Sequence, residues 1–226
     1  MNTLFEQGYL IGTFDYDSII KDDIDFIIEK SKDTNNILCR YDISGKDLIK
    51  VHTNKSCTYE QSLYYDKYVE ETDKNVYGLF QKWFTVETEI KDSFKKLSFE
   101  LIKNLYCIDD INKLSFNDEY TMYINGCFIN SHIDNDKDAN RRICVVLIYL
   151  NKEIPEDAIG GNLIIDDSCG NKITVEPKYT NYAILDFAKN NLRHEVTEVK
   201  NWNRYAYVNF VSLKPEYYEY YTRIWG

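Results

Sequence analysis

The sequence predicts a mainly β fold with N-terminal helices, in which short strands form a sandwich or barrel that the helices support. Two patterns indicate this fold. Apolar residues of the first half recur mostly at helical spacing, whereas from about residue 115 they alternate with a period of two. The chain has 226 residues, of which 44% are hydrophobic, so it can bury a substantial core. Because no internal repeat, low-complexity tract or linker rich in proline and glycine interrupts it, we expect residues 1–226 to form a single domain.

Residues 1–113 are expected to form a helix-rich support. Apolar stripes at helical spacing predict three helices here, at 17–31, 73–84 and 86–106. The last of these has the longest apolar face, so it is the best candidate to brace one side of a sheet. Short strands are expected at 7–14 and at 36–51, the second turning at Gly45.

Residues 114–226 are expected to form the β core. Alternation between turn signals predicts eight strands, at 117–128, 131–135, 141–150, 162–167, 172–177, 182–187, 193–199 and 204–212. The segment Arg142–Leu150 is apolar on both faces, which is typical of a central strand covered on both sides.

Composition excludes several classes of protein. The 37 acidic and 27 basic residues give a net charge of −10, which disfavours nucleic acid as a partner. No apolar run approaches the ~20 residues of a membrane-spanning helix, and the N-terminus lacks the pattern of a secretory signal. The six cysteines show no zinc-site spacing, so we expect reduced thiols and a cytoplasmic location.

Two histidines and an aspartate are candidate metal ligands. In a strand, His132 and Asp134 would project to the same side, and His194 lies in another predicted strand. Two imidazoles and one carboxylate are the protein ligands of non-haem Fe(II) oxygenases, where they leave coordination positions open. The alternative is that the H-x-D tripeptide occurs by chance at the end of a strand.

Arg204 is a candidate for binding an anion. It begins the last predicted strand, on a face whose other residues are apolar: Ala206, Val208 and Phe210. A buried guanidinium needs an anionic partner, which a bound dicarboxylate would supply. The alternative is a structural salt bridge with one of the many acidic residues.

Residues 115–212 carry six short motifs whose order and spacing are specific when taken together. They are Y-x-x-G at Tyr123–Gly126, H-x-D-N at His132–Asn135, an R…Y-L-N strand at Arg142–Asn151, G-G-x-L at Gly160–Leu163, V-x-P at Val175–Pro177, and H-E-V with R-Y-A at His194–Val196 and Arg204–Ala206. This set resembles the 2-oxoglutarate- and Fe(II)-dependent oxygenases of the prolyl-4-hydroxylase type. The resemblance is closest to the cytosolic oxygen-sensing prolyl hydroxylases and their microbial relatives.

The resemblance implies a double-stranded β-helix, the jelly-roll fold of the cupins, braced by helices. It also implies that Fe(II) is bound by His132, Asp134 and His194. Arg204 and the hydroxyl of Tyr149 would bind the C5 carboxylate of 2-oxoglutarate, with Tyr123 near its iron-bound end. Both tyrosines have the alternative of a packing role, because the chain has 20 tyrosines.

The implied reaction is that of a procollagen-proline 4-dioxygenase-like enzyme. A prolyl residue in a peptide or protein would be hydroxylated with O2, while 2-oxoglutarate is converted to succinate and CO2, with ascorbate as a candidate reductant. Two alternatives stay open: the same chemistry on a free amino acid or another side chain, or a non-catalytic binding protein that keeps the barrel. The substrate's identity and the oligomeric state do not follow from the sequence.

Some positions depart from the family pattern or have uncertain roles. Val145 stands where the family usually has threonine, which would remove a polar contact near the co-substrate. The segment Asp42–Asp47 resembles the I-R-G-D turn before a mobile loop, so residues 53–72 would be a substrate lid or, alternatively, an ordinary solvated loop. Asp186 lies in the predicted strand before His194, where a role behind the metal ligands stays open but is unsupported, and His52 is expected to be non-functional.

Overall fold

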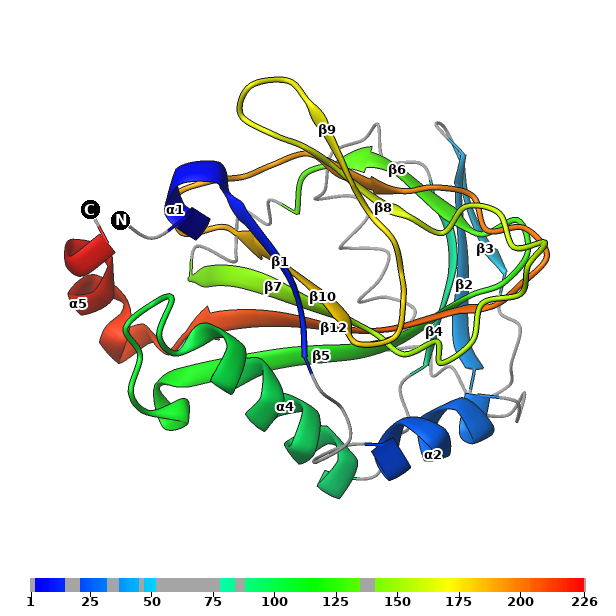
Figure 1. Ribbon diagram of the computed structural model, residues 1–226. Coiled ribbons are helices and arrows are strands. Elements are labelled where there is room, and N and C mark those ends of the chain that lie inside the picture. The colour runs from blue at the N-terminus through cyan, green and yellow to red at the C-terminus, as the bar shows by residue number, and fades with distance from the viewer. Residues whose placement is uncertain are drawn as a thin grey trace.

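The protein folds as a double-stranded β-helix with helices on one side (Figure 1). A computed structural model describes residues 3–14, 21–31, 37–44, 47–51, 78–83, 88–134 and 141–225. The N-terminal part of the chain contributes four strands: β1 (Tyr9–Thr13), β2 (Ile37–Ser44), β3 (Asp47–Val51) and β4 (Gly78–Trp83). The core contributes eight: β5 (Leu114–Tyr123), β6 (Phe128–His132), β7 (Arg142–Tyr149), β8 (Leu163–Asp166), β9 (Lys172–Val175), β10 (Asn181–Asp186), β11 (His194–Val196) and β12 (Arg204–Leu213).

The strands form two facing layers. Antiparallel neighbours run in the order β1-β10-β7-β12-β5-β4-β6-β11-β8-β9, and β2 pairs with β4 and β3. Strand β4 joins the layers, because it pairs with β5 at Gln81–Trp83 and with β6 at Gly78–Leu79. One apolar cluster draws residues from both layers, such as Val145 and Ala206 from one and Leu163 and Val196 from the other. This cluster therefore lies inside the barrel, between the layers.

A second apolar cluster covers the outer face of the layer that is formed by β1, β10, β7, β12 and β5. It is built with four helices: α1 (Thr3–Gln7), α2 (Lys21–Ser31), α4 (Thr88–Ile102) and α5 (Pro215–Trp225). Phe94 of α4 is fully buried, and its ring lies 5.6 Å from that of Tyr120 and 4.7 Å from that of Tyr207. Because burial of such a side chain stabilises by roughly 1.5–3 kcal/mol, α4 is the brace that its apolar stripe predicts. Strand β7 lies between the two clusters, which explains why it is apolar on both faces.

The sequence-based prediction was wrong at 73–84, where the expected helix is strand β4 in the residues described. A short apolar run fits both helix and strand, and pairing with three neighbouring strands decides in favour of β structure. Helix α5 was not predicted. Its sequence nevertheless carries a helix signature, because Pro215 is its first residue and Tyr221 and Trp225, four positions apart, are buried.

All eight core strands predicted from the period of two are present, with shifted ends. The strand expected at 117–128 ends at Tyr123, because Gly126 turns the chain with φ +86° before β6 begins. The strands expected at 7–14 and 36–51 correspond to β1 and to the β2–β3 hairpin. His52 and the lid expected at 53–72 lie outside the described residues.

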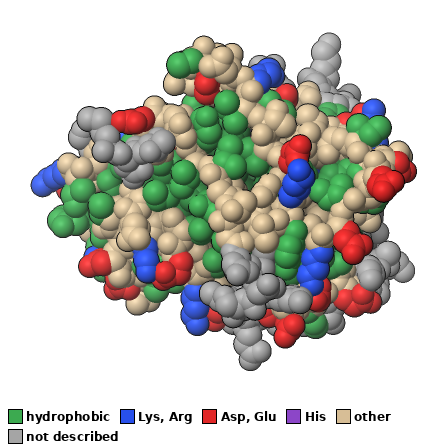
Figure 2. Space-filling view, viewed as in Figure 1, with side chains coloured by type: hydrophobic (Ala, Val, Ile, Leu, Met, Phe, Trp, Pro, Cys, Tyr) green, Lys and Arg blue, Asp and Glu red, His purple; other side chains and the backbone are tan. Residues whose placement is uncertain are grey.

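Charged side chains of both signs are interspersed over the face in Figure 2, and hydrophobic ones gather on the side where α1, β1 and α5 lie. Exposed apolar residues of these elements include Ile11, Tyr220 and Ile224. The described acidic residues therefore form no single patch on this face. Among the helices described, we find none with the length and apolar character needed to cross a membrane.

Candidate active site

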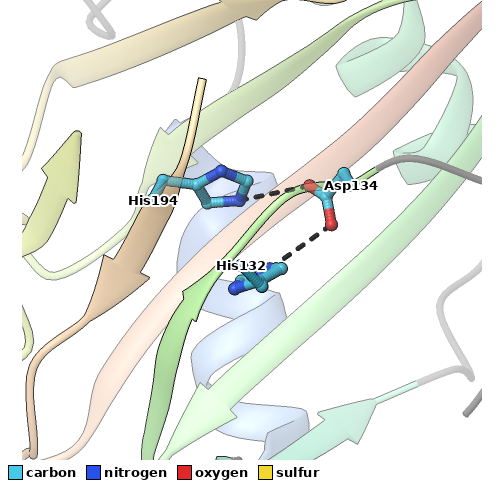
Figure 3. Close-up of side chains that lie close together, drawn as sticks. All are labelled: His132, Asp134 and His194. Carbon is cyan, nitrogen blue, oxygen red and sulfur yellow. Dashed lines mark ion pairs between the residues drawn. The ribbon is translucent and has the colours of Figure 1, made fainter. Parts of the chain in front are cut away.

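His132 and His194 face each other across the pairing of β6 with β11. His132 is the last residue of β6 and His194 is the first of β11, and their ring centroids are 4.4 Å apart. Asp134 follows two residues after the end of β6, and its carboxylate points back towards both imidazoles (Figure 3). All three side chains are at most 9% exposed. The structure thus brings together the three ligands expected from the sequence, although Asp134 lies beyond the strand.

Each imidazole is held by a backbone carbonyl two residues earlier. The Nδ1 atom of His132 lies 2.7 Å from the oxygen of Asn130, and Nδ1 of His194 lies 3.2 Å from the oxygen of Leu192. A carbonyl only accepts hydrogen bonds, so a neutral ring in this position carries its proton on Nδ1. The lone pair is then on Nε2, which is the arrangement of a histidine prepared to bind a metal.

The spacing of the donor atoms fits a single metal ion. Nε2 of His132 lies 3.3 Å from Oδ1 of Asp134, and Nε2 of His194 lies 3.2 Å from Oδ2. All three ligand atoms lie within 4.8 Å of one another. With bonds of ~2.1 Å, ligands on one octahedral face are ~3.0 Å apart. Two imidazoles and a carboxylate at this spacing therefore suit a divalent transition metal on a three-ligand face.

The charges of this cluster favour a bound cation. Burial opposes ionisation of His132, but the hydrogen bond and the negative charge of Asp134 outweigh it and raise the pKa of the imidazole. Burial alone would raise the pKa of Asp134, yet the two histidines hold it well below its usual range. The carboxylate is therefore ionised and faces two imidazoles, an arrangement that is stabilised by positive charge between them.

Arg204 is buried at the start of β12, opposite Tyr123 of β5. It is 2% exposed, and its Nε atom donates to the Gly161 carbonyl at 2.8 Å. Its Nη2 atom has no hydrogen-bond partner among the described residues. The predicted neighbours on this face, Ala206 and beyond, are apolar and belong to the barrel interior. A guanidinium in this position is suited to bind an anion that enters the barrel.

Two aromatic rings flank the guanidinium. The Cζ atom of Arg204 lies 5.1 Å from the ring centroid of Tyr123 and 5.2 Å from that of Tyr149. Burial raises the pKa of both phenols, with Arg204 opposing the shift in each case. The charge of Asp134 also contributes to the raised pKa of Tyr123. The phenol therefore lies within the electrostatic influence of both Arg204 and the candidate metal ligands. Arg204, Tyr123 and Tyr149 therefore form one group at the barrel interior, and the charge of Asp134 acts on Tyr123 within it.

The second of two consecutive glycines makes room for the arginine. Gly160 has φ +71° and Gly161 has φ +75°, a region that favours glycine. A Cβ atom on Gly161 would lie 2.6 Å from Cζ2 of Trp202 and 3.2 Å from Cδ of Arg204. A side chain at Gly161 would thus collide with Trp202 and with Arg204 itself, whereas a Cβ atom on Gly160 would lie 1.8 Å from the carbonyl oxygen of Glu198. These contacts explain both glycines of the G-G-x-L motif.

The remaining sequence candidates have other environments. Val145, which stands in place of a threonine, is buried in the barrel interior, where it offers no polar contact. Asp186 is also fully buried, but it faces the helices: Tyr106 donates a hydrogen bond to it at 2.8 Å. Sequence analysis did not anticipate Arg193, which donates to the carbonyl of Ser131 at 2.9 Å and so links the residues that precede the two histidines.

Comparison with known proteins agrees with this geometry. Residues 119–212, which include all six site residues, match the family described as the 2OG-Fe(II) oxygenase superfamily. The structure is similar to a prolyl-4-hydroxylase from Pseudomonas putida, with a TM-score of 0.62 and 14% identity over 93% of this chain and 95% of that one. A comparison with curated proteins gave no significant match.

Two further solved structures share the fold. One is a prolyl hydroxylase from Trichoplax adhaerens in complex with a peptide fragment of the hypoxia inducible factor oxygen degradation domain, with a TM-score of 0.58 and 15% identity over 99% of this chain and 89% of that one. The other is an oxidoreductase of the 2OG-Fe(II) oxygenase family from Burkholderia pseudomallei, with a TM-score of 0.55 and 12% identity over 91% and 85%. At these identities the likeness establishes the double-stranded β-helix fold.

Proposed function

Because residues 119–212 match the family model of the 2OG-Fe(II) oxygenase superfamily, we propose that the protein is an Fe(II)- and 2-oxoglutarate-dependent dioxygenase that hydroxylates a prolyl residue in a peptide or protein. The observation that carries the proposal is the convergence of His132, Asp134 and His194 within the barrel (Figure 3). The three side chains would hold Fe(II) on one face of its coordination sphere. The other positions would be left for 2-oxoglutarate and O2.

Arg204 would bind the far carboxylate of 2-oxoglutarate. Its buried Nη2 atom has no hydrogen-bond partner among the described residues, and a carboxylate would supply one. Tyr149, whose ring lies beside the guanidinium, would donate its hydroxyl to the same carboxylate. Tyr123 lies on the neighbouring strand, opposite Arg204, and the charge of Asp134 contributes to its raised pKa. It would therefore contact the end of the co-substrate nearer the metal.

The bound iron and 2-oxoglutarate would together activate O2 for hydroxylation of a C–H bond, with release of succinate and CO2. The protein's own residues would bind the metal, orient the co-substrate and exclude water from the site. Apolar side chains such as Val145, Leu147 and Leu185 belong to the same interior cluster as Tyr123 and Tyr149 and would limit the entry of water. A dry interior strengthens the attraction between Arg204 and a carboxylate, which aligns the co-substrate before substrate enters.

The prolyl substrate is the more specific part of the proposal. It is supported by the prolyl-hydroxylase motifs in the sequence and by two solved structures with this fold that are prolyl hydroxylases by name. A prolyl residue in a peptide is also compatible with a chain of net charge −10, which is a poor partner for nucleic acid.

The test is an oxygenase assay with separate readouts for co-substrate and substrate. The protein would be loaded anaerobically with Fe(II) and 2-oxoglutarate, then exposed to O2 with ascorbate and a panel of proline-containing peptides. Mass spectrometry would detect addition of one oxygen atom, and succinate would be quantified in parallel. Asp134→Ala serves as the inactive control.

Three outcomes decide the proposal. Hydroxylated proline with matching succinate supports it in full. Succinate without any hydroxylated peptide supports the oxygenase but contradicts the prolyl substrate. If neither product exceeds that of the Asp134→Ala control, the proposed activity is wrong and a binding role for the barrel is favoured.

A further inference from the structure

The two proposed metal-binding histidines are fixed in different ways. The carbonyl that accepts from Nδ1 of His132 belongs to Asn130, inside β6, between Ile129 and His132, which both pair with β11. The corresponding carbonyl for His194 belongs to Leu192, which lies before β11 begins, in the connection from β10. Strand β11 is only three residues long. Backbone bonds hold the two ends of this connection, from the Phe187 amide to the Ile143 carbonyl and from the Asp166 amide to the Arg193 carbonyl, each at 2.9 Å. Side-chain contacts supply the further support of the residues between these ends.

The carboxylate of Asp186 accepts hydrogen bonds from several residues of the β10–β11 connection. Asp186 is the last residue of β10, and it is 0% exposed. Its Oδ1 atom accepts from the Ala188 amide at 3.1 Å, and its Oδ2 atom accepts from the amides of Lys189 and Asn190, each at 3.1 Å. The Asn190 side chain donates to Oδ2 at 2.8 Å, and Tyr106 donates to Oδ1 at 2.8 Å. One carboxylate thus fixes three successive amides of the chain that leads to His194.

The N-terminal segment closes on the same connection. The Asn190 side chain donates to the carbonyl of Phe5 at 3.3 Å, and the Asp186 amide donates to the carbonyl of Gly8 at 2.9 Å. A Cβ atom on Gly8 would lie 2.8 Å from Cδ1 of Leu192 and 3.0 Å from Cβ of Asn190. The connection is therefore held between Asp186 on one side and the α1–β1 segment on the other. Leu192 and its carbonyl have little freedom to move.

The chemistry of Asp186 suits positioning rather than ion pairing. Among the described residues, no lysine or arginine forms a salt bridge with it, and all five of its hydrogen bonds come from neutral donors. An ionised carboxylate can accept all of them at once. An asparagine of the same size could not, because in either orientation its amide nitrogen would face at least one backbone N–H. The position therefore requires a carboxylate for geometric reasons.

From these contacts we propose that Asp186 is a positioning residue for the metal site. It sets the β10–β11 connection so that the Leu192 carbonyl holds the His194 imidazole with Nε2 directed at the metal. This inference rests on the proposed function only in that it takes His194 as a metal ligand. It assigns Asp186 no contact with metal, co-substrate or substrate.

The test measures metal binding without turnover. Apoprotein would be titrated with Co(II), which gives a visible absorption spectrum that reports ligand geometry, in the absence of O2. The variants are Asp186→Asn and the milder Asn190→Ala, which removes one donor to Oδ2 and the bond to Phe5. The matched control is Asp118→Asn, which makes the same change on β5, where Asp118 pairs with Lys95 of α4 at 3.8 Å. Circular dichroism would establish that each protein is folded at the temperature used.

We expect Asp186→Asn to weaken Co(II) binding about tenfold and to change the Co(II) spectrum. Loss of a group that supports a metal ligand costs about 10- to 100-fold in affinity, and Asp186 acts one step further away. Asn190→Ala should weaken binding about threefold, and the control should stay within about twofold of wild type. If Asp186→Asn does not fold, Asn190→Ala against the same control decides the inference.

The outcomes separate this inference from the proposed function. If wild-type protein does not bind Co(II), or if Fe(II) does not compete with Co(II), the proposed metal site is wrong and the inference falls with it. If wild type binds but Asp186→Asn has the same affinity and spectrum, the proposed function stands and the positioning role is refuted. An equal loss of Co(II) affinity in Asp186→Asn and Asp118→Asn also refutes the positioning role, because the effect would then be one of general stability.

Discussion

Replacement of Arg204 by methionine tests the part of the site that is proposed to bind the distal carboxylate of 2-oxoglutarate. Methionine keeps an unbranched side chain that fills the space of the arginine stem but carries no charge. In wild type the guanidinium is 2% exposed, is bound to the Gly161 carbonyl through Nε, and lies between two tyrosine rings. The variant would leave the distal carboxylate of 2-oxoglutarate buried without its partner.

The expected loss follows from the burial. Removal of one partner of a buried charge pair costs about 3–5 kcal/mol. At 1.36 kcal/mol for each factor of ten, the affinity for 2-oxoglutarate should fall about 150- to 5,000-fold. Without co-substrate the effect of Arg204→Met on unfolding should be small. The lost bond to Gly161 destabilises by about 1 kcal/mol, whereas removal of an unpaired buried charge stabilises.

Two measurements check this reasoning in Co(II)-loaded protein. Calorimetric titration gives the affinity for 2-oxoglutarate, and thermal unfolding gives the stabilisation by it, which is about 2.7 kcal/mol at a hundredfold excess over Kd. Arg204→Met should lose that stabilisation while it keeps Co(II). Arg223→Met on α5, where the arginine side chain is 82% exposed, should behave as wild type. An unchanged affinity in Arg204→Met would remove Arg204 from the co-substrate site.

Three further changes test the rest of the site. Asp134→Ala should abolish detectable Fe(II) binding, since it removes the only anionic ligand of the described cluster, and equilibrium dialysis with intact iron binding would contradict the ligand assignment. Gly161→Ala should weaken 2-oxoglutarate binding at least about tenfold by displacing the neighbouring arginine, whereas Gly170→Ala, also at positive φ but with nothing within 4 Å, should leave it unchanged in the same titration. Metal affinity should fall as the pH drops through the raised pKa of His132, because the proton and the metal compete for Nε2. For the metal-free protein the sign is opposite: the stability that His132 contributes is present below its unfolded pKa of ~6.5 and is lost as the pH rises through the raised folded value, which urea unfolding across pH would measure.

Local sequence patterns predicted most of the core because its strands alternate in the way that a barrel with one face inside requires. Strand β7 was predicted as central from its apolar character alone, and it lies between the two apolar clusters. Segment 73–84 could not be predicted in this way, since its apolar residues also fit a helix and only pairing with distant strands decides. Long-range hydrogen bonding carries no signal within a short window.

The candidate site was predicted in part for reasons that the structure modifies. His132 and Asp134 were expected to share a face because they are two apart in a strand, but β6 ends at His132 and the chain bends to return Asp134 to the histidines. The backbone carbonyls that hold Nδ1 of each ring could not be predicted, because any residue type supplies a carbonyl. Such contacts depend on the path of the chain and not on the identity of the side chain.

Burial alone does not separate the charged residues that bind ligands from those that hold the fold. Asp186 and Arg204 are both almost fully buried, and each begins or ends a strand of the same layer. Asp186 faces the helices and accepts five hydrogen bonds from the chain around it, so its charge is fully satisfied by the protein. Arg204 faces the barrel interior with Nη2 unsatisfied by any described residue, and an unsatisfied buried group is costly unless a ligand completes it. The difference in satisfaction, rather than in burial, therefore assigns Arg204 to ligand binding and Asp186 to the support of His194.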